Sequence, residues 1–180
     1  MRRIIVVSCL VLTGCGGGGG ADALPHPHQT VRDLEKALPG NSVRVGEVEY
    51  AAIGLRTGMF SVTGSHADVL AKGRYIRVRI LVTNRGRERH ELDVYAQRLV
   101  TDRGTAHKPS FDALQVSRGV ATPLTLARDE SRAFDLWFDV PAAEKPRLLR
   151  ITGDPTSSRL SDQLKGAPAT DDPTADLPLN

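Results

Sequence analysis

The sequence predicts an all-β fold, a two-layer antiparallel sandwich spanning residues 43–153. The first observation is the segment YIRVRILVTN (75–84), where every second residue from Ile76 to Val82 is apolar and the residues between are mostly polar or charged. The segment FDLWFDV (134–140) alternates in the same way. A period of two is typical of a strand with one buried and one solvated face. No helical period interrupts the region, and several short strands without helices favour a sandwich.

Weaker strands and turns complete the predicted sandwich. We expect further strands at Arg44–Leu55, Leu92–Thr101, Pro123–Leu126 and Arg147–Thr152. Turns are expected at Asn84-Arg85-Gly86 and Asp102-Arg103-Gly104. Because aromatic residues are few, the core must consist mainly of Val, Ile and Leu around Phe134 and Phe138.

The first fourteen residues, MRRIIVVSCLVLTG, have the layout of a secretory signal peptide. Two arginines precede an apolar run that ends at Leu12, and small residues follow. A transmembrane helix needs about 20 apolar residues, so this run is too short to span a bilayer. Leu12, Thr13, Gly14 and Cys15 then resemble the lipobox of bacterial lipoproteins, in which the cysteine thiol carries a diacylglyceryl group.

The lipobox resemblance implies cleavage between Gly14 and Cys15 and a lipid on Cys15, the new N-terminal residue. Two acyl chains hold a protein stably at a membrane, whereas one chain binds reversibly. We therefore expect a protein anchored in the cell membrane that faces the extracellular side or the periplasm. The alternative is a chance cysteine in an ordinary secretion signal.

A flexible linker is expected over residues 15–29. The run of glycines at 16–20 and the prolines that follow cannot hold regular structure, and a coil of this length spans about 20 Å. His26 and His28 lie within the linker without a third metal ligand nearby. We therefore interpret them as a solvated pair and expect no metal and no other cofactor.

The net charge argues against a nucleic-acid partner. The precursor has 24 Lys and Arg residues, 21 Asp and Glu residues and a formal charge of +3. Removal of residues 1–14 takes away Arg2 and Arg3 and no acid, which lowers the 24 basic residues to 22 against 21 acidic ones. Cys9 is removed with the signal, so Cys15 is left as the only cysteine and no disulfide is expected.

Two segments are predicted to flank the sandwich. In TVRDLEKALPG (30–40), Val31, Leu34 and Leu38 recur at helical spacing before a Pro-Gly stop, which predicts a short helix. This helix is expected to dock on the sandwich or on the membrane surface. Residues 154–180 are rich in Pro, Ser, Thr, Asp and Ala, which predicts a disordered tail.

Three short motifs carry a second resemblance. They are GRYIRVRILVTNRG (73–86), LVTDRGTAHKP (99–109) and FDVP (138–141). Together they resemble a family of immunoglobulin-like bacterial envelope domains of unknown function, to which the mycobacterial immunoprotective extracellular antigen is related. The resemblance implies an immunoglobulin-like sandwich and an envelope location, and it implies no catalytic residues.

Motifs of the common hydrolases are absent from the sequence. There is no Gly-x-Ser-x-Gly elbow of a serine hydrolase and no His-Glu-x-x-His helix of a zinc hydrolase. His66, His90 and His107 lie next to predicted turns, where surface histidines are common. We therefore expect a protein that is not an enzyme.

Two features favour a binding function. The first is a predicted basic strip on the solvated face of the long strand and in the turn after it, made of Lys72, Arg74, Arg77, Arg79, Arg85, Arg87 and Arg89. Such a strip attracts anionic polymers or lipids, but charges on a strand also keep it soluble and guard its edge. The second is Trp137, which the alternation places opposite the core. It either marks a partner surface or is covered by the flanking helix or tail.

The sequence therefore predicts a lipid-anchored binding module of the cell envelope. Its expected partners are the membrane, through the lipid, and an envelope protein or an anionic polymer. The alternative is an accessory or sensor subunit that acts through its tail. A hydrolase without a recognisable motif is the least favoured interpretation.

Overall fold

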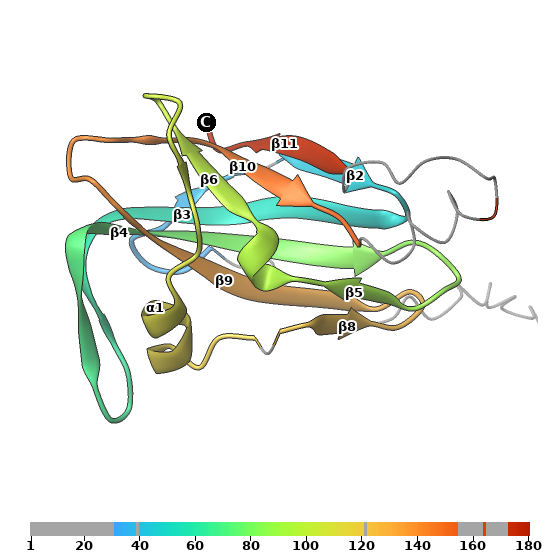
Figure 1. The fold of residues 1–180 in the computed structure, drawn as a ribbon, viewed down its shortest axis with the longest axis horizontal. Helices are drawn as coiled ribbons and strands as arrows, with labels where there is room; N and C mark the ends of the chain where they lie inside the picture. The colour runs from blue at the N-terminus through green and yellow to red at the C-terminus, as the bar shows by residue number, and fades with distance from the viewer. Residues whose placement is uncertain (1–30, 39, 121, 155–163, 165–172) are drawn as a thin grey trace, which may run out of the picture.

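The structure is a computed structural model, and it describes residues 31–38, 40–120, 122–154, 164 and 173–180 (Figure 1). The predicted signal peptide, Gly14, Cys15 and the linker to residue 29 lie outside the described residues.

Antiparallel strands form three sheets, as predicted for an all-β chain. The first sheet has the order β1-β3-β4-β9, with β2 also paired to β3. Its strands are β1 (Lys36–Ala37), β2 (Ser42–Val45), β3 (Val48–Thr63), β4 (Asp68–Asn84) and β9 (Ser131–Val140). The second sheet has the order β11-β10-β6-β7. Its strands are β6 (Arg98–Thr101), β7 (Ala106–His107), β10 (Pro146–Thr152) and β11 (Thr174–Pro178).

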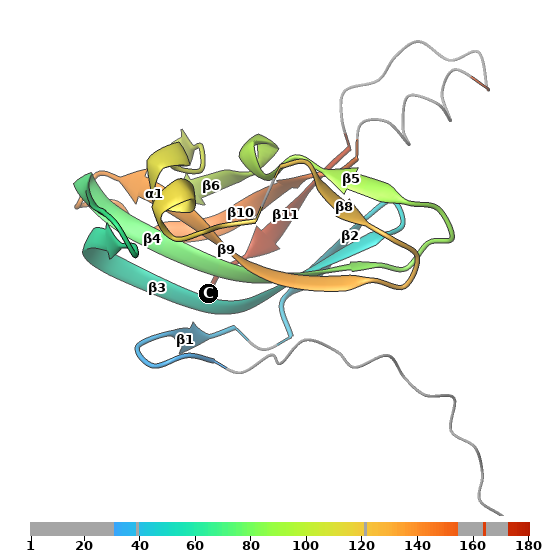
Figure 2. The same cartoon turned by 90° about the horizontal axis from the view of Figure 1, so that it is seen from below.

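A third, two-stranded sheet pairs β5 (His90–Leu92) with β8 (Leu124–Leu126). A short 3₁₀ helix, η1 (Val94–Ala96), follows β5, and one α-helix, α1 (Phe111–Val116), follows β7. The two smaller sheets lie together over one face of the first sheet, so the strands are arranged in two layers (Figure 2).

The core lies between these layers, where the alternation of β4 and β9 predicted it. Ile76, Val78 and Ile80 are at most 1% exposed, and Leu136 and Phe138 on β9 are fully buried. Two of the weaker predicted strands are divided in the structure. The segment 44–55 turns between β2 and β3, and the segment 92–101 is interrupted by η1.

The prediction of a helix at residues 30–40 is wrong for the described part. Residues 31–38, which we call the strap, form a turn at Asp33-Leu34 and then strand β1, which pairs with Leu55 and Gly54 of β3. Leu34 has a positive φ of 66°, and its side chain is 79% exposed. The strap is held by strand pairing and by polar contacts to the sheet, and these contacts outweigh the weak helical propensity of so short a segment.

The strap crosses the outer face of the first sheet, the face turned away from the other layer (Figure 2). Glu35 reaches β4, and Arg32 reaches β9. This face is therefore more covered than the alternation predicted. Tyr75, which was expected on the solvated side of β4, is 2% exposed, and its contacts are with Trp137 and with Ser110 before α1.

The prediction of a disordered tail is wrong for residues 173–180. Strand β11 pairs with β10 from Leu148 to Thr152, and Leu177 and Leu179 are 0% and 2% exposed. The composition of residues 154–180 predicted disorder because apolar residues are sparse. The two leucines near the end are nevertheless spaced so that both reach the core.

Residues of the motifs that carried the family resemblance hold β4 against β9. The Asp139 carboxylate accepts hydrogen bonds from the backbone N–H groups of Lys72 and Gly73. A Cβ atom at Gly73 would lie 2.1 Å from the Val140 carbonyl oxygen, so only glycine allows this approach. These motif residues join β4 to β9.

Candidate functional site

A groove on the outer face of the first sheet contains the predicted site residues Arg77 and Trp137. These two residues are paired directly across β4 and β9, and Asp135 lies two residues before Trp137 on the same face. The three side chains form the floor of the groove. The sequence predicted their faces but not the register that brings them together.

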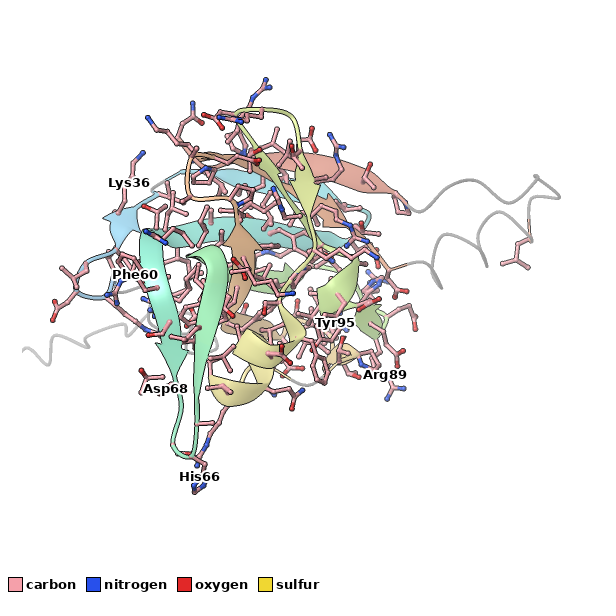
Figure 3. The ribbon with its side chains drawn as sticks, turned by 60° about the vertical axis from the view of Figure 1, so that its left-hand side comes forward. Lys36, Phe60, His66, Asp68, Arg89 and Tyr95 are labelled. Carbon is pink, nitrogen blue, oxygen red and sulfur yellow. The ribbon has the colours of Figure 1, made fainter. Side chains whose placement is uncertain are left out.

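The walls of the groove come from three other segments. The groove has a volume of about 670 Å³ and is lined by Arg32 of the strap, residues Arg56 to Thr63 of β3 and Ser117 after α1, besides the floor. β9 pairs with β4 only from Arg74 onward, so the end of the β3–β4 hairpin, residues 57–73, projects beyond β9. We call this projection the hairpin arm, and Figure 3 shows His66 at its tip.

Each floor side chain has one buried polar atom without a hydrogen-bond partner among the described residues. These atoms are the Arg77 Nε, the Asp135 Oδ1 and the Trp137 Nε1. Leaving a buried polar group unpaired costs about 1–3 kcal/mol, so such groups are rare in folded proteins. Three of them in one groove point to a ligand or to ordered water.

Two ion pairs close the groove toward the strap. Arg77 Nη2 lies 2.7 Å from the Glu35 Oε1, and these side chains are only 11% and 0% exposed. Arg32 Nη1 lies 2.7 Å from the Asp135 Oδ2. Arg56, the register partner of Arg77 on β3, has no ion pair among the described residues. The groove therefore carries an uncompensated positive charge.

Trp137 is buried, not exposed, although it lies on the outer face as predicted. Its side chain is 6% exposed, and its ring packs edge-on against Tyr75 with the ring centroids 6.2 Å apart. The Arg77 guanidinium lies 5.4 Å from the indole centroid, within the range of a cation–π contact. Burial raises the pKa of the Tyr75 phenol, and a hydrogen bond with Ser110 partly opposes this rise.

The seven residues of the predicted basic strip do not lie together. Arg74 covers the ring of Phe60 on the hairpin arm at 3.8 Å. Arg85 is paired with Glu49 beyond the other end of β4, about 40 Å from Lys72 along the strand. Figure 3 shows Arg89 on the opposite side of the domain from Phe60. Lys72 and Arg87 are exposed, whereas Arg77 and Arg79 are half-buried.

Sequence reasoning did not identify Arg32, Glu35, Arg56 or Asp135 as site residues. The one signal for Asp135 was its place on the same face as Trp137, two residues away. No local pattern could indicate Arg32 or Glu35, because their contacts reach residues 103 and 42 positions away.

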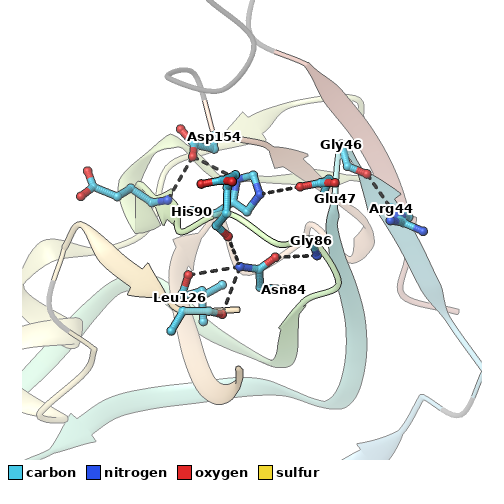
Figure 4. Close-up of polar contacts among 11 residues, drawn as sticks. Arg44, Gly46, Glu47, Asn84, Gly86, His90, Leu126 and Asp154 are labelled. Carbon is cyan, nitrogen blue, oxygen red and sulfur yellow. Dashed lines mark hydrogen bonds and ion pairs between the residues drawn. The ribbon is translucent and has the colours of Figure 1, made fainter. Parts of the chain in front are cut away.

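A second polar cluster surrounds His90, which was expected at the surface but is only 6% exposed (Figure 4). Its Nδ1 lies 3.2 Å from the Asp154 Oδ2, and its Nε2 lies 3.4 Å from the Glu47 Oε2. Burial, and then the nearby Asp154 carboxylate, raise the pKa of Tyr50 above its ordinary value. The cluster ties β5 to the β2–β3 turn and to the end of β10, and we interpret it as a structural cross-link.

The described residues contain neither a metal-binding cluster nor a membrane-spanning helix. No group of three or more His, Cys, Asp and Glu residues within them is arranged to hold a metal ion. No helix among them is long and apolar enough to cross a bilayer.

Solved structures with a similar fold come from several bacteria. The yjhA protein from Bacillus subtilis is 14% identical with a TM-score of 0.58, and the match covers 81% of this chain and 100% of that one. A conserved hypothetical protein from Bacillus anthracis is 11% identical with a TM-score of 0.52, covering 66% and 89%. The secreted protein MPT63 from Mycobacterium tuberculosis is 14% identical with a TM-score of 0.42, covering 69% and 89%.

No curated protein matches the chain. A family model does match, and it extends over residues 38–161, from the end of the strap past the end of β10. This range contains all three motifs that carried the resemblance and more than half of the chain. The chain belongs to the family described as Domain of unknown function (DUF4352).

Proposed function

We propose that the protein is a lipid-anchored envelope protein whose immunoglobulin-like sandwich binds a ligand in the outer groove. The observation that carries the proposal is that three side chains lining the groove each have a buried polar atom without a hydrogen-bond partner among the described residues. Among the described residues that line the groove there is no histidine, and the Asp135 carboxylate is paired with Arg32. This composition favours binding over acid–base catalysis.

The floor favours a ligand that carries hydroxyl groups. The Arg77 Nε and the Trp137 Nε1 are donors, whereas the Asp135 Oδ1 is an acceptor. A hydroxyl group can accept from one of the donors and donate to the carboxylate at the same time. Polyols and sugars, which are common in envelope polymers, therefore match the floor better than an apolar ligand.

Binding in the groove is expected to change the fluorescence of the protein. Trp137 is the only tryptophan, so its emission reports on the groove floor directly. We expect glycerol, chitobiose or glycerol 3-phosphate to change the emission of Trp137 in a saturable titration. Asp135→Ala removes the acceptor and is expected to weaken the response, whereas Arg85→Ser, at the far end of β4, is expected to leave it unchanged.

The same titration separates the groove from the alternative of contact through the tail. Replacing residues 156–170 with a Gly-Ser linker of equal length leaves β11 in the chain. The groove proposal expects unchanged binding of the probes. A loss of binding in this variant would favour the tail, and no response to any of the three probes would overturn the groove as a binding site.

The lipid anchor is tested at Cys15. We expect the mature protein in the membrane fraction to begin at Cys15 and to carry two or three acyl chains, because two chains are needed for stable anchoring. Cys15→Ser is expected to move the protein to the soluble fraction. Intact mass spectrometry measures both outcomes, and an unmodified soluble wild-type protein would contradict the proposal.

A further inference from the structure

Glu35 lies beside the groove, where it contacts Arg77 of the groove floor but is not itself among the described residues that line the groove. Its side chain is completely buried, and its Oε1 accepts a hydrogen bond from the Arg77 Nη2 at 2.7 Å. Its Oε2 accepts from the backbone N–H of Arg32 at 2.8 Å. The carboxylate thus holds one edge of the Arg77 guanidinium, and the Nε of that guanidinium is left unpartnered among the described residues.

The part of the strap that carries Glu35, residues 31–35, has little apolar packing, whereas Leu38 at the other end of the strap is 2% exposed and belongs to the core. The strand of the strap, β1, has two residues, and its turn places Leu34 at a φ of 66°. A left-handed conformation is unfavourable for a residue with a Cβ. The side chains of Val31 and Leu34 are exposed and add little packing. Residues 31–35 therefore have few apolar contacts to lose if Glu35 leaves Arg77, while β1 and Leu38 keep the rest of the strap on the sheet.

Departure of Glu35 would leave three arginines facing one carboxylate. Arg32, Arg56 and Arg77 all line the groove, and Asp135 is the single acid among its lining residues. The planar guanidinium group of arginine matches the oxygens of a phosphate group in geometry and donates strong, charge-assisted hydrogen bonds to them. A phosphate carries about −1.5 to −2 charge as a monoester at neutral pH, which suits this excess of arginine better than a carboxylate does.

We propose that Glu35 competes with a phosphate group for Arg77 and that the phosphate group of a polyol ligand bound in the groove displaces Glu35 from Arg77. The inference rests on the proposed binding function of the groove and names the anionic part of the ligand. The hydroxyl groups of the ligand then contact Asp135 and Trp137, while the phosphate contacts Arg56 and Arg77.

The test compares glycerol 3-phosphate with glycerol, with Trp137 fluorescence as the readout. Glu35→Gln removes the competing charge at nearly constant shape and is expected to tighten phosphate binding about tenfold, because the site is then open in a larger fraction of molecules. Gly54→Ala is a steric version of the same change. A Cβ at Gly54 would lie 2.7 Å from the Glu35 Oε2 and would push the carboxylate away. Glu49→Gln is the matched control. Glu49 lies on β3, as Gly54 does, but it forms an exposed pair with Arg85, so we expect this variant to have no effect on binding.

Two arginine variants test the site by removing the proposed contacts to the phosphate group. Arg56→Ser is expected to weaken glycerol 3-phosphate binding several-fold and to leave glycerol binding unchanged. Because Arg56 has no ion pair among the described residues, the variant should keep its fold. Arg77→Met is expected to remove the preference for phosphate, with the urea midpoint measured to confirm folding. Binding should also weaken as salt rises.

The outcomes separate this inference from the proposed function. Equal binding of glycerol and glycerol 3-phosphate, unchanged in Glu35→Gln, would overturn the phosphate site while the groove still binds polyols. No response to either probe would overturn both. Tighter binding of glucuronate than of glycerol 3-phosphate would also reject the phosphate assignment. Vesicles containing phosphatidylglycerol, compared with phosphatidylcholine vesicles, distinguish a lipid headgroup from a free phosphate ester as the source.

Discussion

Removing residues 173–180 is expected to unfold the domain. The deletion takes away β11, and with it Leu177 and Leu179, which are 0% and 2% exposed. Truncating a buried leucine to alanine costs about 2–5 kcal/mol, and a domain of this size is stable by only about 5–15 kcal/mol. The deletion also leaves the edge of β10 without its partner. Urea denaturation followed by circular dichroism measures the loss.

Single substitutions within β11 provide the controls. Leu177→Ala is expected to lower the free energy of unfolding by about 2–5 kcal/mol. Asp176→Ala should cost far less, because its pair with Arg150 is exposed and surface pairs contribute about 0–1 kcal/mol. A truncated chain with the urea midpoint of the full chain would show that β11 does not stabilise the sandwich.

Asn84→Ala is expected to lower the free energy of unfolding by at least about 3 kcal/mol. The Asn84 side chain is fully buried, and its Nδ2 donates to the carbonyl oxygens of Glu88, Leu126 and Ala127 (Figure 4). Its Oδ1 accepts from the Gly86 N–H at 2.8 Å. Alanine leaves all four backbone groups without this partner, and the hydrogen bonds to Leu126 and Gly86 are buried.

The conservative variant tests this account of Asn84. Asn84→Asp keeps the acceptor for Gly86 but turns a carboxylate toward three carbonyl oxygens, so we expect it to be at least as destabilising as alanine. Asn41→Ala is the control, because its two hydrogen bonds, to Pro178 and Asn180, are exposed. Asn84→Ala with a midpoint close to that of Asn41→Ala would contradict the assigned role.

The sequence signals that succeeded were local. The alternation in β4 and β9 predicted which side chains face the core, and the Asn84-Arg85-Gly86 signal predicted the turn that follows β4. It did not indicate that the Asn84 side chain reaches across to β8 and its following turn. That contact joins residues 42 and 43 positions apart, so no short pattern contains it.

The errors came from segments whose structure depends on distant partners. The strap has helical spacing, but Glu35 finds Arg77 and the chain pairs with β3. The C-terminal residues have a disordered composition, but two leucines reach the core. In both segments, burial against another part of the chain outweighs a weak local preference.

By itself the sequence determined the β-strand character of the chain, the core face of its main strands and the expectation of a lipid anchor at Cys15. These follow from the two-residue period of strands and from short motifs, which need no knowledge of other parts of the chain. The tertiary structure alone decided the register that pairs Arg77 with Trp137 and the path of the strap across them. The physical reason is that the groove is made by pairing and packing between residues far apart in the chain.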